Sequence, residues 1–202
     1  MAEPHQSPEL HPLLASRWSP TTFDETHEAS PADVEVLLEA ARWAPSAGNS
    51  QPWAFIVGRR GDRTHQRLVR SLARSSAAWA PTASLLVANL AHRLVEDTDW
   101  EYSEFASYDL GQAVAHMTFQ AQALGLSVRQ FRAFDRAGVE AEFAVPAHWQ
   151  VTTMAAFGVS PAGAAPGDGA ATPFPQRHRR APEEISWPSR PPPSAPRAGE
   201  TP

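Results

Sequence analysis

The sequence contains neither cysteine nor lysine, and its 17 basic residues are all arginine. Without cysteine there are no disulfides, no thiolate-bound metals and no thiol nucleophile. Without lysine there is no Schiff-base chemistry on a side-chain amine. Any catalysis by this chain must therefore come from other side chains or from a bound cofactor.

Long apolar stretches and export signals are also missing. No run of about 18 apolar residues occurs, so a membrane span is not expected. Residues 1–12 lack the basic and apolar regions of a signal peptide, and we predict a cytoplasmic protein. The net charge of −5 argues against a nucleic-acid partner.

Several well-known site motifs are absent from the sequence as well. It contains no Gly-x-Gly-x-x-Gly and no P-loop pattern, which disfavours dinucleotide-binding and P-loop folds. The eight histidines are scattered, so no metal site and no Ser-His-Asp arrangement is predicted. His116 lies in an apolar helical stretch, where a locally satisfied core or interface histidine is the favoured interpretation.

The length of 202 residues is typical of one domain with a sizeable core. We expect a loose arm over residues 1–12, the domain over residues 13–185, and a Pro-rich disordered tail over residues 186–202. Apolar periodicity predicts helices over residues 31–43, 64–74 and 108–124, and strands over residues 53–58, 84–90, 127–131 and 149–157.

A polar turn joins the first of these helices to the first strand. Pro45 and Pro52 restrict the backbone at its two ends. Between them stand residues with side chains or main-chain groups suited to a polar ligand, namely Ser46, Gly48, Asn49 and Gln51. From the residues alone, an ordinary helix-to-strand loop and a ligand-binding turn both remain open.

A second polar segment precedes that helix. The guanidinium of Arg17 stands two positions from the hydroxyl of Ser19, a pair that suits a phosphate. A solvated loop arginine explains the same pattern.

Four segments, in the same order along the chain, resemble the FMN-dependent nitroreductase family. They are Arg-x-Ser-x-x-x-Phe-Asp from Arg17, Ala-Arg-Trp-Ala-Pro-Ser-x-x-Asn-x-Gln-Pro-Trp from Ala41, Asp-x-Gly-x-Ala from Asp109 followed by Gln-Ala-x-x-Leu-Gly-Leu from Gln120, and Arg-x-Arg-x-x-x-x-Glu from Arg177. The resemblance implies an α+β sandwich with a central, mainly antiparallel sheet flanked by helices. It also implies an intertwined homodimer with two flavins at the subunit interface.

The resemblance further implies where FMN is held. One subunit would hold the phosphate, and the partner would supply most of the polar turn. The segment after the third strand would pass over the flavin ring. The implied cofactor-binding residues are Arg17, Trp18, Ser19, Pro45, Ser46, Ala47, Asn49, Ser76, Gln130, Arg132, Ala133, Arg177 and Arg179.

The reaction implied by the resemblance is a ping-pong exchange. NADPH or NADH reduces the flavin, and a nitroaromatic, quinone or related small-molecule acceptor is reduced in turn. No catalytic side chain is assigned, because flavin N5 carries the chemistry. Residues 91–105 either shape the acceptor pocket or form a solvent-facing loop.

Three positions depart from the family pattern. Thr21 stands where the family has a second basic residue, Ser76 where it commonly has asparagine, and Arg132 where small residues are usual. These departures leave two alternatives open. One is a flavin-storing or regulatory protein with little turnover, and the other is a specialised flavin dehydrogenase or oxidase acting on a metabolite.

Overall fold

The computed structural model describes residues 10–161 and 179–187, which are built around one antiparallel sheet. Its strands, in the spatial order β1-β2-β4-β3, are β1 (Trp53–Arg59), β2 (Leu85–His92), β4 (Trp149–Gly158) and β3 (Ser127–Phe131). All three neighbouring pairs are antiparallel. The predicted α+β class is therefore confirmed, and the predicted strands lie within a few residues of the observed ones.

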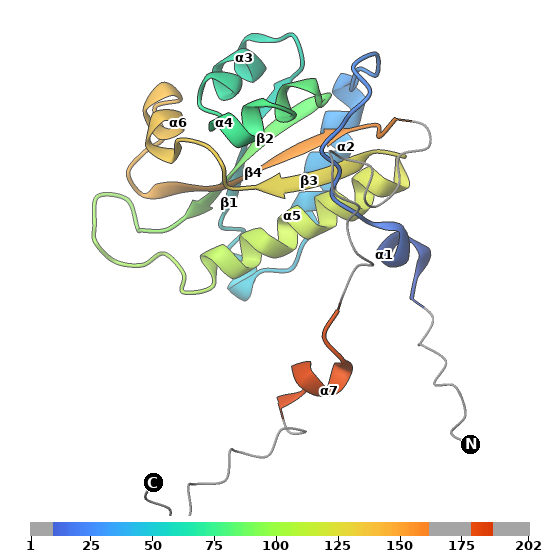
Figure 1. Ribbon diagram of the computed structural model, residues 1–202. Coiled ribbons are helices and arrows are strands. Elements are labelled where there is room, and N and C mark those ends of the chain that lie inside the picture. Colours follow the sequence, from blue (N-terminus) through green and yellow to red (C-terminus); the bar gives the residue numbers. More distant parts are fainter. Residues whose placement is uncertain (1–9, 162–178, 188–202) are drawn as a thin grey trace, which may run out of the picture.

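Helices cover both faces of this sheet (Figure 1). One face carries α2 (Pro31–Arg42) and α5 (Ala106–Ala123), with α1 (Pro12–Ser16) beside α5. The other face carries α3 (Arg63–Arg70), α4 (Arg74–Ala77) and α6 (Arg136–Glu142). The remaining elements are the 3₁₀ turns η1 (Ala47–Asn49) and η2 (Ala80–Thr82) and the short helix α7 (Pro182–Ile185). No helix within the described ranges is long and apolar enough to cross a membrane.

Helix α2 begins where its sequence predicts, at a capping box. The Ser30 hydroxyl accepts the Asp33 N–H at 3.1 Å, and the Asp33 carboxylate accepts the Ser30 N–H at 2.8 Å. These two bonds satisfy donors that a helix start otherwise leaves open. The Ser30 N–H and the Ser30 hydroxyl both lie 2.8 Å from the Asp33 carboxylate and lower its pKa, because both contacts favour the charged form.

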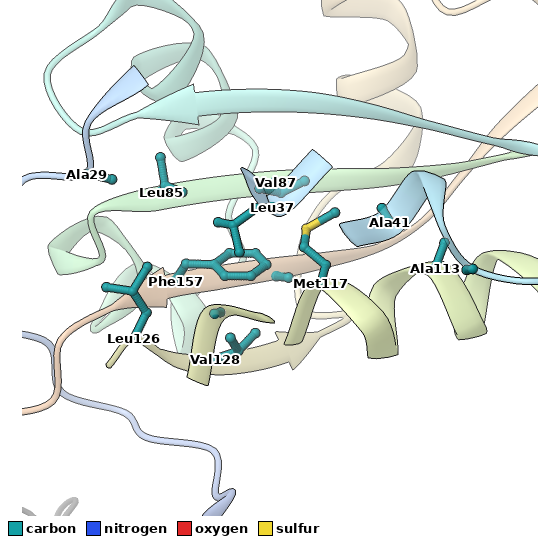
Figure 2. Close-up of a cluster of buried hydrophobic side chains, with 13 residues drawn as sticks. Ala29, Leu37, Ala41, Leu85, Val87, Ala113, Met117, Leu126, Val128 and Phe157 are labelled. Carbon is teal, nitrogen blue, oxygen red and sulfur yellow. The ribbon is translucent and has the colours of Figure 1, made fainter. Parts of the chain in front are cut away.

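The core between the sheet and the α2–α5 layer is centred on Phe157 of β4, which is fully buried. Leu37 of α2 and Met117 of α5 lie around its ring (Figure 2). Helix α5 ends at Ala123, and Gly125 follows with φ +78°, a left-handed conformation that glycine adopts without steric cost. The predicted helix end at this glycine is confirmed.

A second core lies on the opposite face of the sheet. Leu68 of α3, Val139 of α6 and Met154 of β4 are all fully buried there. Arg67 of α3 forms an ion pair with Glu142 of α6 at 2.6 Å and so links the two helices. The helices of this layer close their face of the sheet, and the candidate site lies on the α5 side.

The sequence predicted one exposed helix over residues 64–74, and the structure confirms a helix there but ends it earlier. Helix α3 ends at Arg70, because Leu72 leaves the helix to form a bridge with Phe134. The N–H groups of Ala73 and Asp135 extend this contact by donating to the carbonyls of Ala133 and Ser71. Helix α6 was not predicted, although Asp135 caps it by accepting the Gly138 N–H at 3.1 Å.

Candidate functional site

The predicted phosphate segment and the predicted flavin strand meet at one cleft of about 250 Å³. Arg17 and Ser19 line it from the chain that follows α1, and Gln130 lines it from β3. Helix α5 and β3 supply the remaining walls, formed by Ala115, Thr118, Phe119 and Val128. Cationic, hydroxyl and amide groups thus share the lining of this cleft with apolar side chains.

The polar groups of this cleft are oriented by one another. Arg17 donates from Nη1 to the Ser19 hydroxyl at 3.3 Å. The Gln130 amide lies 3.5 Å from the hydroxyl of Thr118, which itself donates to the Val114 carbonyl at 2.7 Å. Thr118 is buried, so its orientation is fixed by the helix that carries it.

Trp18 lines an adjoining cavity of about 140 Å³ between α1 and the end of α5. Arg17 lines both cavities, and Gln122 of α5 donates to the Ser16 hydroxyl at 2.6 Å across this second one. The segment from Ser16 to Ser19 is therefore fastened to α5 beside the cleft.

Arg129 was missed by the sequence analysis, yet it is fastened to the same segment. Its Nη1 donates to the Ser19 carbonyl at 3.0 Å, and its guanidinium lies 5.1 Å from the centre of the Trp79 ring. Burial lowers its pKa, but an arginine stays charged at neutral pH. It has no ion-pair partner among the described residues, so its positive charge is not cancelled locally.

The polar turn after α2 has a strained backbone. Positive φ values occur at Gly48 (+59°), Asn49 (+55°) and Gln51 (+47°), and two of these three residues are not glycine. The Ser46 hydroxyl accepts the Gln51 N–H at 3.0 Å. Ala47 donates its N–H to the buried carboxylate of Asp109 at 3.0 Å, which ties the turn to the first turn of α5.

This turn and the cleft contact different parts of α5. The turn contacts Asp109, whereas the cleft is lined by Ala115, Thr118 and Phe119. Asp109 and Thr118 are nine positions apart, which corresponds to about 14 Å along the helix at about 1.5 Å per residue. Within the described chain, no residue from Pro45 to Asn49 lines the cleft, so one protomer does not bring all predicted residues together.

Ser76 and the turn after β3 are joined directly. The Ser76 hydroxyl is buried and donates to the carbonyls of Ala73 and Ala133. Arg132 donates to the Phe134 carbonyl at 3.2 Å, and its guanidinium lies 4.8 Å from the Phe134 ring centre. The flavin contacts predicted for Ser76, Arg132 and Ala133 remain predictions. The structure adds that the Ser76 hydroxyl links α4 to the turn after β3.

The C-terminal phosphate pair is only partly described. Arg177 lies outside the described residues, and Arg179 is exposed just before α7. Their predicted contact to a flavin phosphate also remains a prediction.

The 93–105 connection is irregular, as expected, and it packs against the end of the sheet. The Tyr102 ring stacks on His92 at 3.8 Å between centres, and His92 stacks on Trp149 at 4.6 Å. The Tyr102 hydroxyl donates to the Ser50 carbonyl at 3.2 Å. The connection therefore contacts the polar turn, while Trp100 remains exposed.

A groove of about 550 Å³ runs over the outer side of α2 and α5. Val36 and Trp43 contribute to it from α2 and its C-cap, and Phe119 and His116 from α5. His116 thus lies in the groove wall, not in the core. Phe119 lines both the groove and the cleft, so the two are continuous.

The donor set of the cleft fits a flavin mononucleotide. A guanidinium and a hydroxyl match a phosphate group, the amide of Gln130 matches polar ring edges, and Phe119 and Val128 match an aromatic face. The cleft volume is below the 300–1,000 Å³ of typical complete ligand pockets. It therefore corresponds to part of a site, with further residues needed to close it.

Comparisons with known proteins bear on the family of this chain. Residues 14–88 match the model of the nitroreductase family. The chain is 41% identical over 66 residues to the major NAD(P)H-flavin oxidoreductase of Aliivibrio fischeri. The aligned region covers 31% of this chain and 30% of that protein. It is 32% identical over 78 residues to the oxygen-insensitive NADPH nitroreductase of Helicobacter pylori strain J99. This alignment covers 39% of this chain and 37% of that protein. The matches thus span about a third of the length of these curated relatives.

Solved structures extend the likeness over most of the chain. An oxidoreductase containing FMN superposes with a TM-score of 0.71 at 26% identity, over 77% of this chain and 79% of that one. A nitroreductase family protein from Clostridium difficile 630 shares the fold, with a TM-score of 0.65 at 22% identity over 86% and 94%. The family model, the curated relatives and the fold all support the nitroreductase family for this chain.

Proposed function

We propose that this protein is a flavin-dependent oxidoreductase that takes electrons from NADPH or NADH and passes them to a small-molecule acceptor. The observation that carries the proposal is the convergence of Arg17, Ser19 and Gln130 on one cleft of mixed polar and apolar lining. The relatives named as NAD(P)H-flavin oxidoreductase and NADPH nitroreductase support the same activity. Nitroaromatics and quinones are the proposed acceptors, and the cytoplasm is the proposed compartment.

Each group of the cleft has a proposed role in holding FMN. Arg17 and Ser19 would bind the phosphate, together with Arg177 and Arg179. Gln130 would contact the ring, with Thr118 fixing its amide. Bound FMN would supply the hydride exchange at N5 that a ping-pong reaction between NAD(P)H and an acceptor requires. The protein would position the cofactor and exclude water from one side of it.

A homodimer is part of the proposal, because one protomer leaves the site incomplete. The polar turn contacts the first turn of α5, the cleft lies along the middle of this helix, and the groove on α2 and α5 exposes apolar side chains beside the cleft. Two copies packed antiparallel along this face would bring the turn of one copy to the cleft of the other. Packing would also cover Val36 and Trp43, which are exposed in the single chain.

A flavin-storing protein with little turnover is the second candidate. It is favoured by Thr21, which replaces a basic residue of the family pattern, and by Ser76, whose hydroxyl is committed to backbone carbonyls. Both features reduce the groups available to stabilise a reduced, anionic flavin. A specialised dehydrogenase or oxidase remains an alternative from the sequence.

The test is a visible spectrum of the full-length protein after loading with FMN and desalting. Retained flavin bands that bleach on anaerobic addition of NADPH or NADH are expected, and the faster donor identifies the physiological one. Retained bands that do not bleach would favour the storage protein or an oxidase reduced by its own substrate. Protein that emerges without flavin would overturn the proposal.

A binding titration assigns the phosphate site. Arg17→Ala should raise the Kd for FMN by roughly 10- to 100-fold, because hydrogen bonds to charged groups contribute about 1.5–3 kcal/mol. The control is Arg70→Ala, which removes an exposed arginine of α3 on the opposite face of the sheet. Replacing Arg177 and Arg179 together by alanine tests the C-terminal pair, and an unchanged Kd would remove that assignment.

A further inference from the structure

The turn from Ser46 to Gln51 adopts a conformation that its own sequence does not favour. Asn49 and Gln51 have positive φ values, which place them in a region where side chains other than glycine are uncommon. Such strain persists only where the surroundings impose it, and it is concentrated at ligand-binding positions. Contacts with the rest of the chain must therefore hold this turn in its strained conformation.

Asp109 makes the most distant of these contacts in the sequence. Its Oδ2 accepts the Ala47 N–H at 3.0 Å, across 62 positions of the chain. The Asp109 residue is 2% exposed and has no ion-pair partner among the described residues. A buried acid without a basic partner is uncommon, because removing a carboxylate from water is unfavourable unless hydrogen bonds compensate.

The rest of the turn is held by weaker or local contacts. The Ser46 hydroxyl accepts the Gln51 N–H within the turn itself. Among the described residues outside the turn, Tyr102 alone adds a side-chain hydrogen bond besides that of Asp109, by donating to the Ser50 carbonyl at 3.2 Å. Asp109 lies on the longest helix of the described chain, so it is the rigid point to which the turn is fixed.

We propose that Asp109 is a positioning residue of the cofactor site. Its carboxylate holds the Ala47 amide, and so it keeps the turn in the strained shape that presents Ser46 and Asn49 to FMN. The inference rests on the proposed function, since it assumes that this turn contacts the cofactor. A carboxylate suits this task better than an apolar side chain, because only an acceptor fixes the amide direction.

The experiment compares Asp109→Ala and Asp109→Asn with the control Asn89→Ala. Asn89 is fully buried in the sheet and donates to the Thr153 hydroxyl at 3.0 Å, so its loss removes a buried polar contact that does not involve the turn. Each variant is measured for FMN affinity, for thermal stability and for hydrogen exchange of the Ala47 amide without FMN.

We expect Asp109→Ala to raise the Kd for FMN at least tenfold and to abolish protection of the Ala47 amide. Asp109→Asn should recover most of both, because its carboxamide oxygen still accepts a hydrogen bond. Asn89→Ala should lower thermal stability and leave the Kd within twofold of the wild type. A Kd unchanged in Asp109→Ala, with stability lowered as in the control, would show a purely structural residue and overturn the proposal.

Tyr102→Phe keeps the inference testable if Asp109→Ala does not fold. It removes only the hydroxyl that holds Ser50, and we expect a two- to fourfold rise in Kd. An unchanged Kd in both Tyr102→Phe and Asp109→Asn, with Ala47 protection lost in the latter, would overturn the positioning role. If the wild type itself binds no FMN, the proposed function fails and the positioning role fails with it. Loss of Ala47 protection in Asp109→Ala would then show that Asp109 has only a structural role.

Discussion

The two faces of the sheet are covered by helices in different ways. The face under α3, α4 and α6 is closed by the chain itself, with Leu68, Val139 and Met154 fully buried and an ion pair between Arg67 and Glu142. The outer side of the α2–α5 layer instead carries an apolar groove, a cleft and exposed side chains such as Val36. One face therefore stabilises the protomer, and the other is suited to a partner and a ligand.

This difference assigns separate consequences to mutations on the two faces. Changes in the closed layer should alter the free energy of unfolding without changing affinity for a ligand. Changes on the outer side of α2 and α5 should alter association or FMN binding and leave the folded protomer almost as stable. A mutation that violated this separation would show that the two layers are coupled through the sheet.

The largest effect on unfolding is expected for Leu68→Ala. Leu68 is fully buried in the closed layer, and such truncations lower the free energy of unfolding by about 2–5 kcal/mol. Chemical denaturation of the apo protein measures the change. Leu14→Ala, at a half-exposed leucine of α1, is the control and should change it by less than about 1 kcal/mol. A Kd for FMN that rose with Leu68→Ala would contradict the separation of the faces.

Val36→Arg tests the outer side of the α2–α5 layer. Val36 is 41% exposed and lines the groove proposed as the dimer interface. A charge buried there without a partner should weaken association by about 2 kcal/mol or more, roughly a 30-fold change in the dimer Kd. Sedimentation equilibrium measures it. Val95→Arg, at a 40% exposed valine outside the groove, should leave association unchanged. Equal behaviour of the two variants would remove the groove from the interface.

Arg129→Gln tests how the cleft is held at the edge of the sheet. We expect the Kd for FMN to rise about tenfold, or about 1.4 kcal/mol, because Ser19 loses its donor and the cleft loses a nearby charge. The dependence of the Kd on salt should also weaken, since one cation is removed. Arg129→Lys retains the charge but not the planar fork, and should recover only part of the affinity. An unchanged Kd and salt dependence in Arg129→Gln would contradict this role.

The sequence predicts best those features that depend on neighbouring residues. The Ser30 cap, the end of α5 at Gly125 and the limits of β3 are written in local patterns, and all three are confirmed. The break between α3 and α4 was missed, because Leu72 pairs with Phe134, 62 positions away. Local helix propensity is overridden there by a contact that no short window contains.

The same limit applies to the site. Arg17, Ser19 and Gln130 were predicted through a family resemblance, and the structure brings them to one cleft. Arg129 and Asp109 were not predicted, because their partners lie 110 and 62 positions away in the sequence. An acid within an apolar helix was the available signal for Asp109, since such a residue requires a buried partner.

The smallest effect is expected at the start of α2. Ser30→Ala removes the hydroxyl that accepts the Asp33 N–H, and should lower the free energy of unfolding by about 1 kcal/mol at neutral pH. FMN affinity and dimer association should not change, because the cap is exposed and remote from the groove. Thermal or chemical denaturation of wild type and variant in parallel measures the difference.

The pH dependence of this difference tests its cause. The folded-state pKa of Asp33 is lowered by its contacts with Ser30, so the stabilisation is present above the ordinary carboxyl pKa of 3.8 and is lost as the pH falls through the lowered value. The gap between wild type and Ser30→Ala should therefore be constant from pH 7 to 5 and should narrow below pH 4. A gap that stayed constant at low pH would mean that the contact between the Ser30 hydroxyl and the Asp33 carboxylate does not contribute to the stability difference, since the variant keeps the Ser30 N–H contact.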